Sequence, residues 1–453
     1  MTARLRAMSQ CGVHGQVSTG EARRGTLSVR QAAFIGVASM VGAGIFSLLG
    51  AAGEVAGTAV WLSFLAAGMV ALLQGYSFSK LGARYPSAGG LLEYVVRGYG
   101  NGHITGIIAW LVLAVNAVIT AMVAVSFGSY AGSAIGADDT VFATKAFAVL
   151  LIVVMTALNV LGSQAVARVQ SVVVVVVISI LSIFAVATLS NADFGLLAPS
   201  GYPPAGDIVA SVALTFFAFL GFGVITFTAA ELADPPRQLP RAVYLAIGIA
   251  TVIYVAVSLG VFGTLTVDEV IASGGTALAV AAEPVLGQAG FWLMTVTALF
   301  ATAGATNAGL YPASGLSEHL VSIGQFPPLL ARRIGGRLPM GLLITAVASM
   351  ILAAGFDLNA IASIGSVVAL VIFTLVGVGH MRIREETGAN AAILVLGVLG
   401  AAVVLVMFVP TLVEEPLTVG ALVFVLLQSI VLDFLWKRSR DSRPPTPAVS
   451  PSA

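Results

Sequence analysis

Twelve apolar segments divide this chain, and each is long enough to cross the roughly 30 Å hydrocarbon layer of a bilayer as one α-helix. Of the 453 residues 58% are hydrophobic and only 9% are charged, a composition far from that of water-soluble domains. We therefore expect an all-α integral membrane protein. The predicted spans are 31–50, 59–78, 104–128, 142–161, 169–189, 208–230, 242–265, 291–311, 338–355, 360–379, 391–410 and 419–435.

The basic residues test this count, because Lys and Arg collect in alternate connections when every span has been identified. They precede the first span and follow every even-numbered one, as Arg84 and Arg97 follow the second, and Lys145 is the exception. The pattern predicts a multi-pass protein of the plasma (inner) membrane with both termini in the cytoplasm. Residues 1–28 are expected to be an N-terminal tail and 437–453 a disordered C-terminal tail, with the membrane domain at 29–436.

A glycine-rich interruption, Gly42-Ala43-Gly44-Ile45-Phe46, lies halfway along the first span, and Gly221 and Gly223 lie at the matching depth of the sixth. Broken helices at that depth are tolerated beside a cavity or a bound solute. The first and sixth spans enter the membrane from opposite faces, which predicts a 5+5 inverted repeat of 29–189 and 207–382, with two extra helices in 390–436. Glycine also packs helices closely in membranes, so close packing is the alternative for either pair alone.

The side chains argue against catalysis. The four histidines have no metal-ligand spacing, no Gly-Lys dipeptide offers an ATP-binding phosphate loop, and the spans lack clustered carboxylates or a nucleophile with a base. We therefore expect neither an enzyme nor a protein with a metal or cofactor. A net charge of +1 gives no indication of nucleic-acid binding.

Five motifs in order resemble the amino acid, polyamine and organocation (APC) transporter superfamily. They are Gly42 to Phe46, Tyr85-Pro86-Ser87-Ala88-Gly89-Gly90, Phe217 to Phe222, the connection from Ala230 to Ala242, and Leu299 to Leu310. The resemblance covers nearly the whole chain. It implies a broken-helix, inverted-repeat transporter of amino acids.

The resemblance also implies a substrate site. Gly42, Ala43 and Gly44, followed by Ile45, would cradle the substrate carboxylate at a helix N-terminus. The carbonyls of Met40, Phe217 and Leu220 would accept from its ammonium group. The remaining expected site residues are Asn116 near the pocket, and Phe219, Gly221 and Phe222, with both phenylalanines as a lid or wall or in ordinary packing. Because no midplane acid is present, neutral amino acids are favoured over cationic ones.

The basis of energy coupling stays open at this point. Thr302 and Thr306 offer hydroxyls for a sodium ion, or bond their own helix backbone, and Glu231 offers a cytoplasmic gate or an ion pair with a base near Arg168 or Arg241. The lysine of some proton-coupled relatives is absent from 172–177, and Gly223, Leu232 and Gly315 replace charged residues that the family often carries. Proton symport, sodium symport and exchange therefore all stay open as mechanisms of energy coupling.

Three functions compete. The leading one is a secondary active transporter of amino acids in the lipid bilayer, with a proton or sodium as a co-transported partner where it is a symporter. The second is a non-transporting sensor or partner subunit that retains the fold, and the third is a passive channel. The last two helices would serve a homodimer contact or would simply face lipid.

Overall fold

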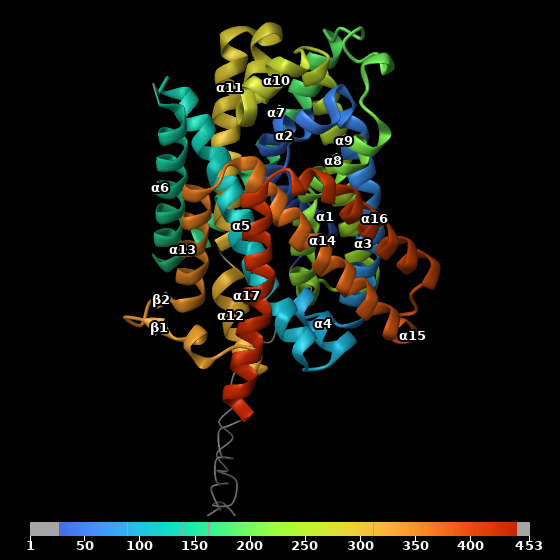
Figure 1. Ribbon diagram of the computed structural model, residues 1–453, viewed down its shortest axis with the longest axis vertical. Coiled ribbons are helices and arrows are strands. Elements are labelled where there is room, and N and C mark those ends of the chain that lie inside the picture. Colours follow the sequence, from blue (N-terminus) through green and yellow to red (C-terminus); the bar gives the residue numbers. More distant parts are fainter. Residues whose placement is uncertain (1–26, 88, 138, 162–163, 311, 442–453) are drawn as a thin grey trace, which may run out of the picture.

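The computed structural model describes residues 27–441 apart from 88, 138, 162–163 and 311, and leaves out the side chains of 43, 164–171, 312, 314 and 441. Long helices packed side by side make up most of this part of the chain (Figure 1). Strands β1 (Arg333–Ile334) and β2 (Leu338–Pro339) pair antiparallel as a small hairpin. The class predicted from the apolar segments, a helical membrane protein, is confirmed.

The helices fall into three groups by length and type. The long ones are α3 Val60–Arg84, α5 His103–Ala134, α6 Thr140–Leu161, α7 Gln164–Ser190, α9 Pro235–Phe262, α11 Ala277–Leu310, α14 Leu358–Arg382, α16 Ala391–Val413 and α17 Pro416–Asp441. The shorter ones are α1 Val29–Ala43, α2 Ile45–Ala56, α4 Leu91–Tyr99, α8 Ala205–Phe217, α10 Val267–Ser273, α12 Pro312–Ser322, α13 Met340–Gly355 and α15 Arg384–Thr387. The 3₁₀ segments are η1 Gly57–Ala59, η2 Pro199–Gly201, η3 Leu220–Glu231, η4 Gly274–Thr276 and η5 Pro328–Ala331.

By length and composition, ten helical stretches in the described part of the chain can cross a membrane, and two shorter apolar helices, α1 and α13, accompany them. Every span expected from the sequence coincides with a helix or with a pair of helices in series. The first expected span is divided between α1 and α2, and the sixth between α8 and η3. The last helix, α17, continues through Asp441, beyond its expected end at Leu435.

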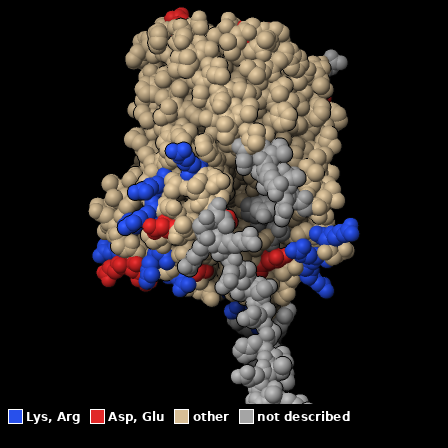
Figure 2. Space-filling view, turned by 180° about the vertical axis from the view of Figure 1, so that it is seen from behind, with Lys and Arg blue, Asp and Glu red and all other residues tan. Residues whose placement is uncertain are grey.

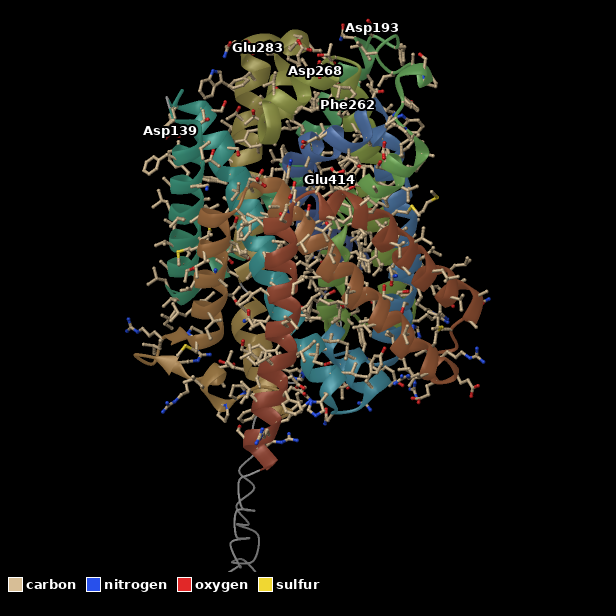
Figure 3. All side chains as sticks on the ribbon, in the orientation of Figure 1. Asp139, Asp193, Phe262, Asp268, Glu283 and Glu414 are labelled. Carbon is tan, nitrogen blue, oxygen red and sulfur yellow. The ribbon has the colours of Figure 1, made fainter. Side chains whose placement is uncertain are left out.

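Charged side chains gather at one end of the molecule, below a broad belt that shows almost none (Figure 2). We call this the basic end; it is where α4, α12, α15 and the β1–β2 hairpin lie (Figure 1). The opposite, acidic end carries Asp139, Asp193, Asp268 and Glu283 (Figure 3). An uncharged belt between two charged ends is the distribution that a protein embedded in a bilayer requires.

Small residues allow the central helices to approach closely. α3 packs along α9, and α5 packs along both α6 and α11. At Gly128 a Cβ would overlap the Thr144 carbonyl oxygen of α6, so only glycine fits this crossing. Contacts of this kind are the normal means of helix association in lipid, where burial of apolar side chains gives no advantage over contact with acyl chains.

Candidate functional site

The first interruption is a single residue, Gly44. α1 starts with a capping box, in which the Gln31 amide nitrogen donates to Ser28 Oγ (3.3 Å) and the Ser28 amide nitrogen donates to Gln31 Oε1 (2.9 Å). It ends where the Gly44 N–H donates to the Met40 carbonyl (2.9 Å). α2 then begins as a new helix, in which the Ser47 and Leu48 amides donate to the Gly44 carbonyl.

The second interruption is longer and of another kind. α8 ends at Phe217, after which the amides of Ala218 and Phe219 bond three residues back, to the carbonyls of Thr215 and Phe216. The chain continues as η3, a 3₁₀ segment of 12 residues. Such segments seldom exceed three or four residues, and a long one marks a hinge or a strained sequence.

The two interruptions lie against each other. A Cβ on Gly44 would come within 2.5 Å of the Ala218 Cβ, and one on Gly221 would come within 2.5 Å of the Met40 amide nitrogen. α1 and η3 therefore pack with almost no side-chain volume between them. Gly44 and Gly221, which are more than 170 positions apart in the sequence, thus both lie where the two interruptions pack together.

The sequence did not indicate Tyr254, which joins this site from α9. Its hydroxyl donates to the Ala218 carbonyl (3.2 Å) and would lie 2.8 Å from a Cβ on Gly44. Tyr254 is fully buried, and its ring packs against Phe219 with ring centroids 5.2 Å apart. A freed carbonyl at the second interruption is therefore satisfied by a side chain, as buried backbone groups in lipid must be.

The three residues of the expected carboxylate cradle have different surroundings in the structure. Gly42 and Ala43 lie inside α1, and the amide of Gly44 is already bonded to Met40. A Cβ on Gly42 would meet Ala305 and the carbonyl of Ala301, so Gly42 serves the packing of α1 on α11. Because the first amides of a helix lack intrahelical acceptors, Ile45 and Phe46 at the start of α2 are the better donors.

The expected carbonyl acceptors and aromatic wall belong to the core. Met40 accepts the Gly44 amide, and the Phe217 ring packs on α14, where a Cβ at Gly365 would overlap it. Phe219 and Phe222 are both fully buried, and Phe222 packs edge to face on Phe78 (5.4 Å). Neither aromatic side chain faces lipid.

The asparagine amides of α5, α6 and α11 are bonded in two different ways. Asn159 Nδ2 on α6 donates to Asn307 Oδ1 on α11 (2.8 Å), whereas Asn116 Nδ2 donates to the carbonyl of Val112 one turn back in its own helix (3.1 Å). The structure therefore does not bring the Asn116 amide to either interruption by a hydrogen bond.

The expected ion residues make local bonds. Thr302 Oγ1 donates to the Ala298 carbonyl (2.6 Å) and Thr306 Oγ1 to the Thr302 carbonyl (2.9 Å), both fully buried on α11. A cavity of about 20 Å³, room for a single water, lies between α1, α7 and α11, and the side chains that line it are apolar. Its lining includes Gly42, Val173 and Ala305.

Glu231 lies at the end of η3 with an exposed side chain, and its carbonyl accepts from the Leu27 amide (3.4 Å). It takes part in none of the ion pairs among the described side chains. The side chain of Arg168, one of the two expected partners, lies outside the described residues. No group of three His, Cys, Asp or Glu side chains that would hold a metal occurs in the searched part of the chain.

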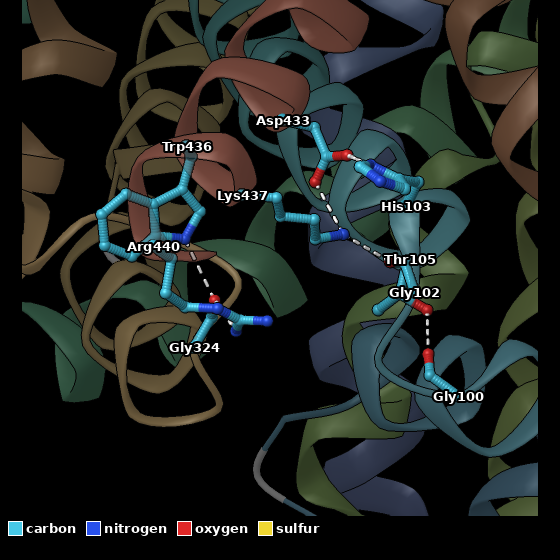
Figure 4. A network of polar contacts seen from close by, with 9 residues as sticks. All are labelled: Gly100, Gly102, His103, Thr105, Gly324, Asp433, Trp436, Lys437 and Arg440. Atoms are coloured by element: carbon cyan, nitrogen blue, oxygen red, sulfur yellow. Dashed lines mark hydrogen bonds and ion pairs between the residues drawn. The ribbon is translucent and has the colours of Figure 1, made fainter. Parts of the chain in front are cut away.

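A buried ion pair at the basic end is a second feature that the sequence reasoning missed. Asp433 on α17 pairs with Lys437 (2.9 Å) and with His103 on α5 (2.6 Å), and Lys437 also donates to the Gly102 carbonyl (2.6 Å) (Figure 4). Lys437, which we expected in a disordered tail, is thus buried within a helix. Asp433 interrupts an apolar run, which was the available signal.

A multi-pass membrane protein whose core holds two interrupted helices in contact has the architecture of the transporters that bind a solute at such interruptions. Comparison with known proteins narrows this class. The family profile described as amino acid permease matches residues 27–432, and the chain therefore belongs to the amino acid permease family. The resemblance noted from the five motifs is confirmed, and the chain is a membrane amino acid transporter by family.

Several curated proteins are similar along most of the chain. An inner membrane transport protein of Escherichia coli, YbaT, is 32% identical over 411 residues, which cover 90% of this chain and 95% of that protein. An uncharacterised protein of Methanocaldococcus jannaschii is 32% identical over 83% of this chain and 86% of its own length. A cationic amino acid transporter 3 of Arabidopsis thaliana, described as mitochondrial, is 26% identical over 77% of this chain and 61% of its own.

Proposed function

We propose that this protein is a secondary active transporter that carries neutral amino acids across the plasma membrane by alternating access. The observation that supports the proposal most directly is the contact between Gly44 and Ala218, which joins two interrupted helices in one buried site. Amides at the start of α2 would bind the substrate carboxylate, and carbonyls near the end of α8 would accept from its ammonium group.

The proposal includes a complete membrane topology. Twelve spans are obtained when α1 with α2 and α8 with η3 each count as one crossing and α13 counts as another. Residues 29–189 and 207–382 would then be the two inverted repeats, with α16 and α17 added outside them. The basic end would face the cytoplasm, in keeping with the preference of Lys and Arg for that side.

The preference for neutral substrates rests on charge. Among the described buried residues, the one carboxylate is that of Asp433, and it is already paired with Lys437 and His103 at the basic end. A cationic substrate side chain buried at the interruptions would have no counter-ion, which is strongly unfavourable in lipid. The Arabidopsis relative is named for cationic amino acids, so this preference separates the present chain from that relative.

The second candidate is a non-transporting sensor with the same fold, favoured by the uncharged residues Gly223, Leu232 and Gly315. The test that separates the two is uptake of labelled amino acids by liposomes that contain the purified protein, with pH, sodium and internal amino acid gradients imposed separately. Saturable uptake identifies a transporter and its driving gradient. Stabilisation by an amino acid without any flux would identify the sensor, and uptake of lysine in preference to neutral amino acids would contradict the charge argument.

A further inference from the structure

Four hydroxyls on three neighbouring helices are fully buried and have no hydrogen-bond partner. We call them the hydroxyl set: Ser47 on α2, Ser126 and Tyr130 on α5, and Ser366 on α14. Helical Ser and Thr usually donate to a carbonyl one turn back, as Thr120 and Ser129 do on the same α5. Burial of an unpaired hydroxyl is unfavourable, and few occur in folded proteins, so this group requires an explanation.

Helix register brings the hydroxyls of α2 and α14 to the same depth. Asn359 Nδ2 donates to Glu54 Oε2 (2.9 Å), which fixes the two helices against each other near the acidic end. Ser47 lies seven residues before Glu54, and Ser366 lies seven residues after Asn359. Seven residues are close to two turns, so each serine lies on the same face as its anchor and roughly 10 Å further into the molecule.

The hydroxyls of α5, those of Ser126 and Tyr130, lie near Ser47 of α2. The Tyr130 ring packs edge to face on Phe46, the residue before Ser47, with ring centroids 6.2 Å apart. Ser126 precedes Tyr130 by four residues and therefore shares its face of α5. The neighbouring Ser129 lines an open pocket of about 270 Å³ that Gly50, Glu54 and Asn359 also line.

The hydroxyl set also adjoins both interruptions. The Ser47 amide donates to the Gly44 carbonyl (3.1 Å), so Ser47 lies one turn beyond the first interruption. Ser366 follows Gly365, the residue on α14 that faces the Phe217 ring at the second. The set therefore lies between the expected binding site of the substrate backbone and the pocket near the acidic end.

We propose that the hydroxyl set binds the substrate side chain and selects amino acids whose side chain is uncharged and carries a hydrogen-bonding group, serine and threonine being the smallest. This inference rests on the proposed transport function. A hydroxyl both donates and accepts, so four of them satisfy a polar neutral side chain. An aliphatic side chain of the same shape leaves them unpaired, which is the arrangement that discriminates most strongly against an analogue lacking the polar group.

The test compares threonine with valine, which have nearly the same shape, as competitors of labelled-threonine uptake into liposomes. We expect the wild-type protein to require at least about tenfold more valine than threonine for half-inhibition. Ser126→Ala and Tyr130→Phe should each lower that ratio several-fold. The matched control is Ser179→Ala on α7, whose exposed hydroxyl donates to the Val175 carbonyl of its own helix and should leave the ratio unchanged.

Thermal unfolding of the same variants without ligand provides a second readout. Because the removed hydroxyls have no partner, Ser126→Ala and Tyr130→Phe should leave the unfolding temperature of the ligand-free protein unchanged or raise it, while the stabilisation by threonine becomes smaller. If the hydroxyls are structural, their removal should lower the unfolding temperature of the ligand-free protein and leave the stabilisation by threonine unchanged.

The outcomes separate the two proposals. Equal inhibition by threonine and valine in a protein that transports amino acids would overturn the role of the hydroxyl set and leave the transport function intact. An unchanged ratio of valine to threonine at half-inhibition in both Ser126→Ala and Tyr130→Phe would also overturn the role of the hydroxyl set and leave the transport function intact. If no amino acid is taken up and none stabilises the protein, both proposals are overturned.

Discussion

Gly44 and Ala218 lie in contact, so that a single added carbon on Gly44 would come within 2.5 Å of the Ala218 Cβ and 2.9 Å of its Cα. Contacts this short do not occur between real side-chain carbons, and the second of these atoms belongs to the backbone. The two interruptions therefore have complementary surfaces, and a substitution at one of them also changes the packing of the other. Several consequences of this contact are open to measurement.

Gly44→Ala should abolish amino acid binding, because the added methyl group must separate α1–α2 from the end of α8. Overpacking of this kind costs about 1–3 kcal/mol of stability. Insertion and expression should remain near normal. The measurement is stabilisation of the purified protein by a panel of amino acids, with Gly248→Ala on α9, where nothing lies within 4 Å of an added Cβ, as the control. Unchanged stabilisation would exclude Gly44 from the binding site.

Two glycines of η3 offer a sharper comparison. A Cβ on Gly221 would meet the backbone of Ser39 and Met40 at 2.5–2.6 Å, whereas a Cβ on Gly223 would meet nothing within 4 Å. Gly221→Ala should therefore destabilise the protein by about 1–3 kcal/mol and lower uptake at least tenfold, and Gly223→Ala should do neither. Thermal unfolding and liposome uptake decide between them. Equal effects of the two substitutions would mean that the α1–η3 contact is unimportant.

The interruptions, the helical membrane class and the family could all be predicted from the sequence, because glycine pairs, hydropathy and charge are local signals. The partner of a buried group is not a local signal. Nothing in the residues around Tyr254 indicates that its hydroxyl bonds a carbonyl 36 positions away. Lys437 follows an apolar run, which is typical of a helix leaving the membrane, but its burial depends on Asp433 and on Gly102, 335 positions distant.

The same limit applies to the glycines of the expected cradle. Gly42 and Gly44 are equivalent in a motif, yet the first packs against α11 and the second forms the interruption. Both glycines meet a neighbouring element closely, Gly42 at Ala305 of α11 and Gly44 at Ala218 after α8, so the motif alone does not show which of them ends the helix. That choice is made by tertiary packing, which overrides local preference.

Tyr254→Phe tests the hydroxyl that lies between the interruptions. The buried Ala218 carbonyl would lose its donor, so we expect a loss of about 1–3 kcal/mol in stability and a several-fold lower uptake. Tyr202→Phe is the control, because it removes a tyrosine hydroxyl whose partner is a side chain, Trp61 Nε1 (3.0 Å), instead of a carbonyl at an interruption. The comparison uses initial uptake rates and unfolding temperatures. A loss of stability without any loss of uptake would assign Tyr254 a purely structural role.

The buried ion pair at the basic end predicts a large stability effect from a small change. Asp433→Asn leaves the Lys437 ammonium buried without a counter-charge, and removal of one member of such a pair costs about 3–5 kcal/mol. The Asp433 side chain is 1% exposed and that of Lys437 is 7% exposed, so water cannot replace the lost charge. Thermal unfolding in detergent measures the effect.

The control is Glu93→Gln on α4, which breaks the pair with Arg97 at the same i,i+4 spacing but on the surface, where such pairs contribute about 0–1 kcal/mol. The double variant Asp433→Leu with Lys437→Met should be more stable than Asp433→Asn alone, since no buried charge is left unpaired. If Asp433→Asn lowers the stability no more than Glu93→Gln does, the contacts of Asp433 with His103 and of Lys437 with Gly102 do not hold α17 against α5. Other contacts would then hold α17 in place, among them the hydrogen bond from Trp436 Nε1 to the Gly324 carbonyl (3.0 Å).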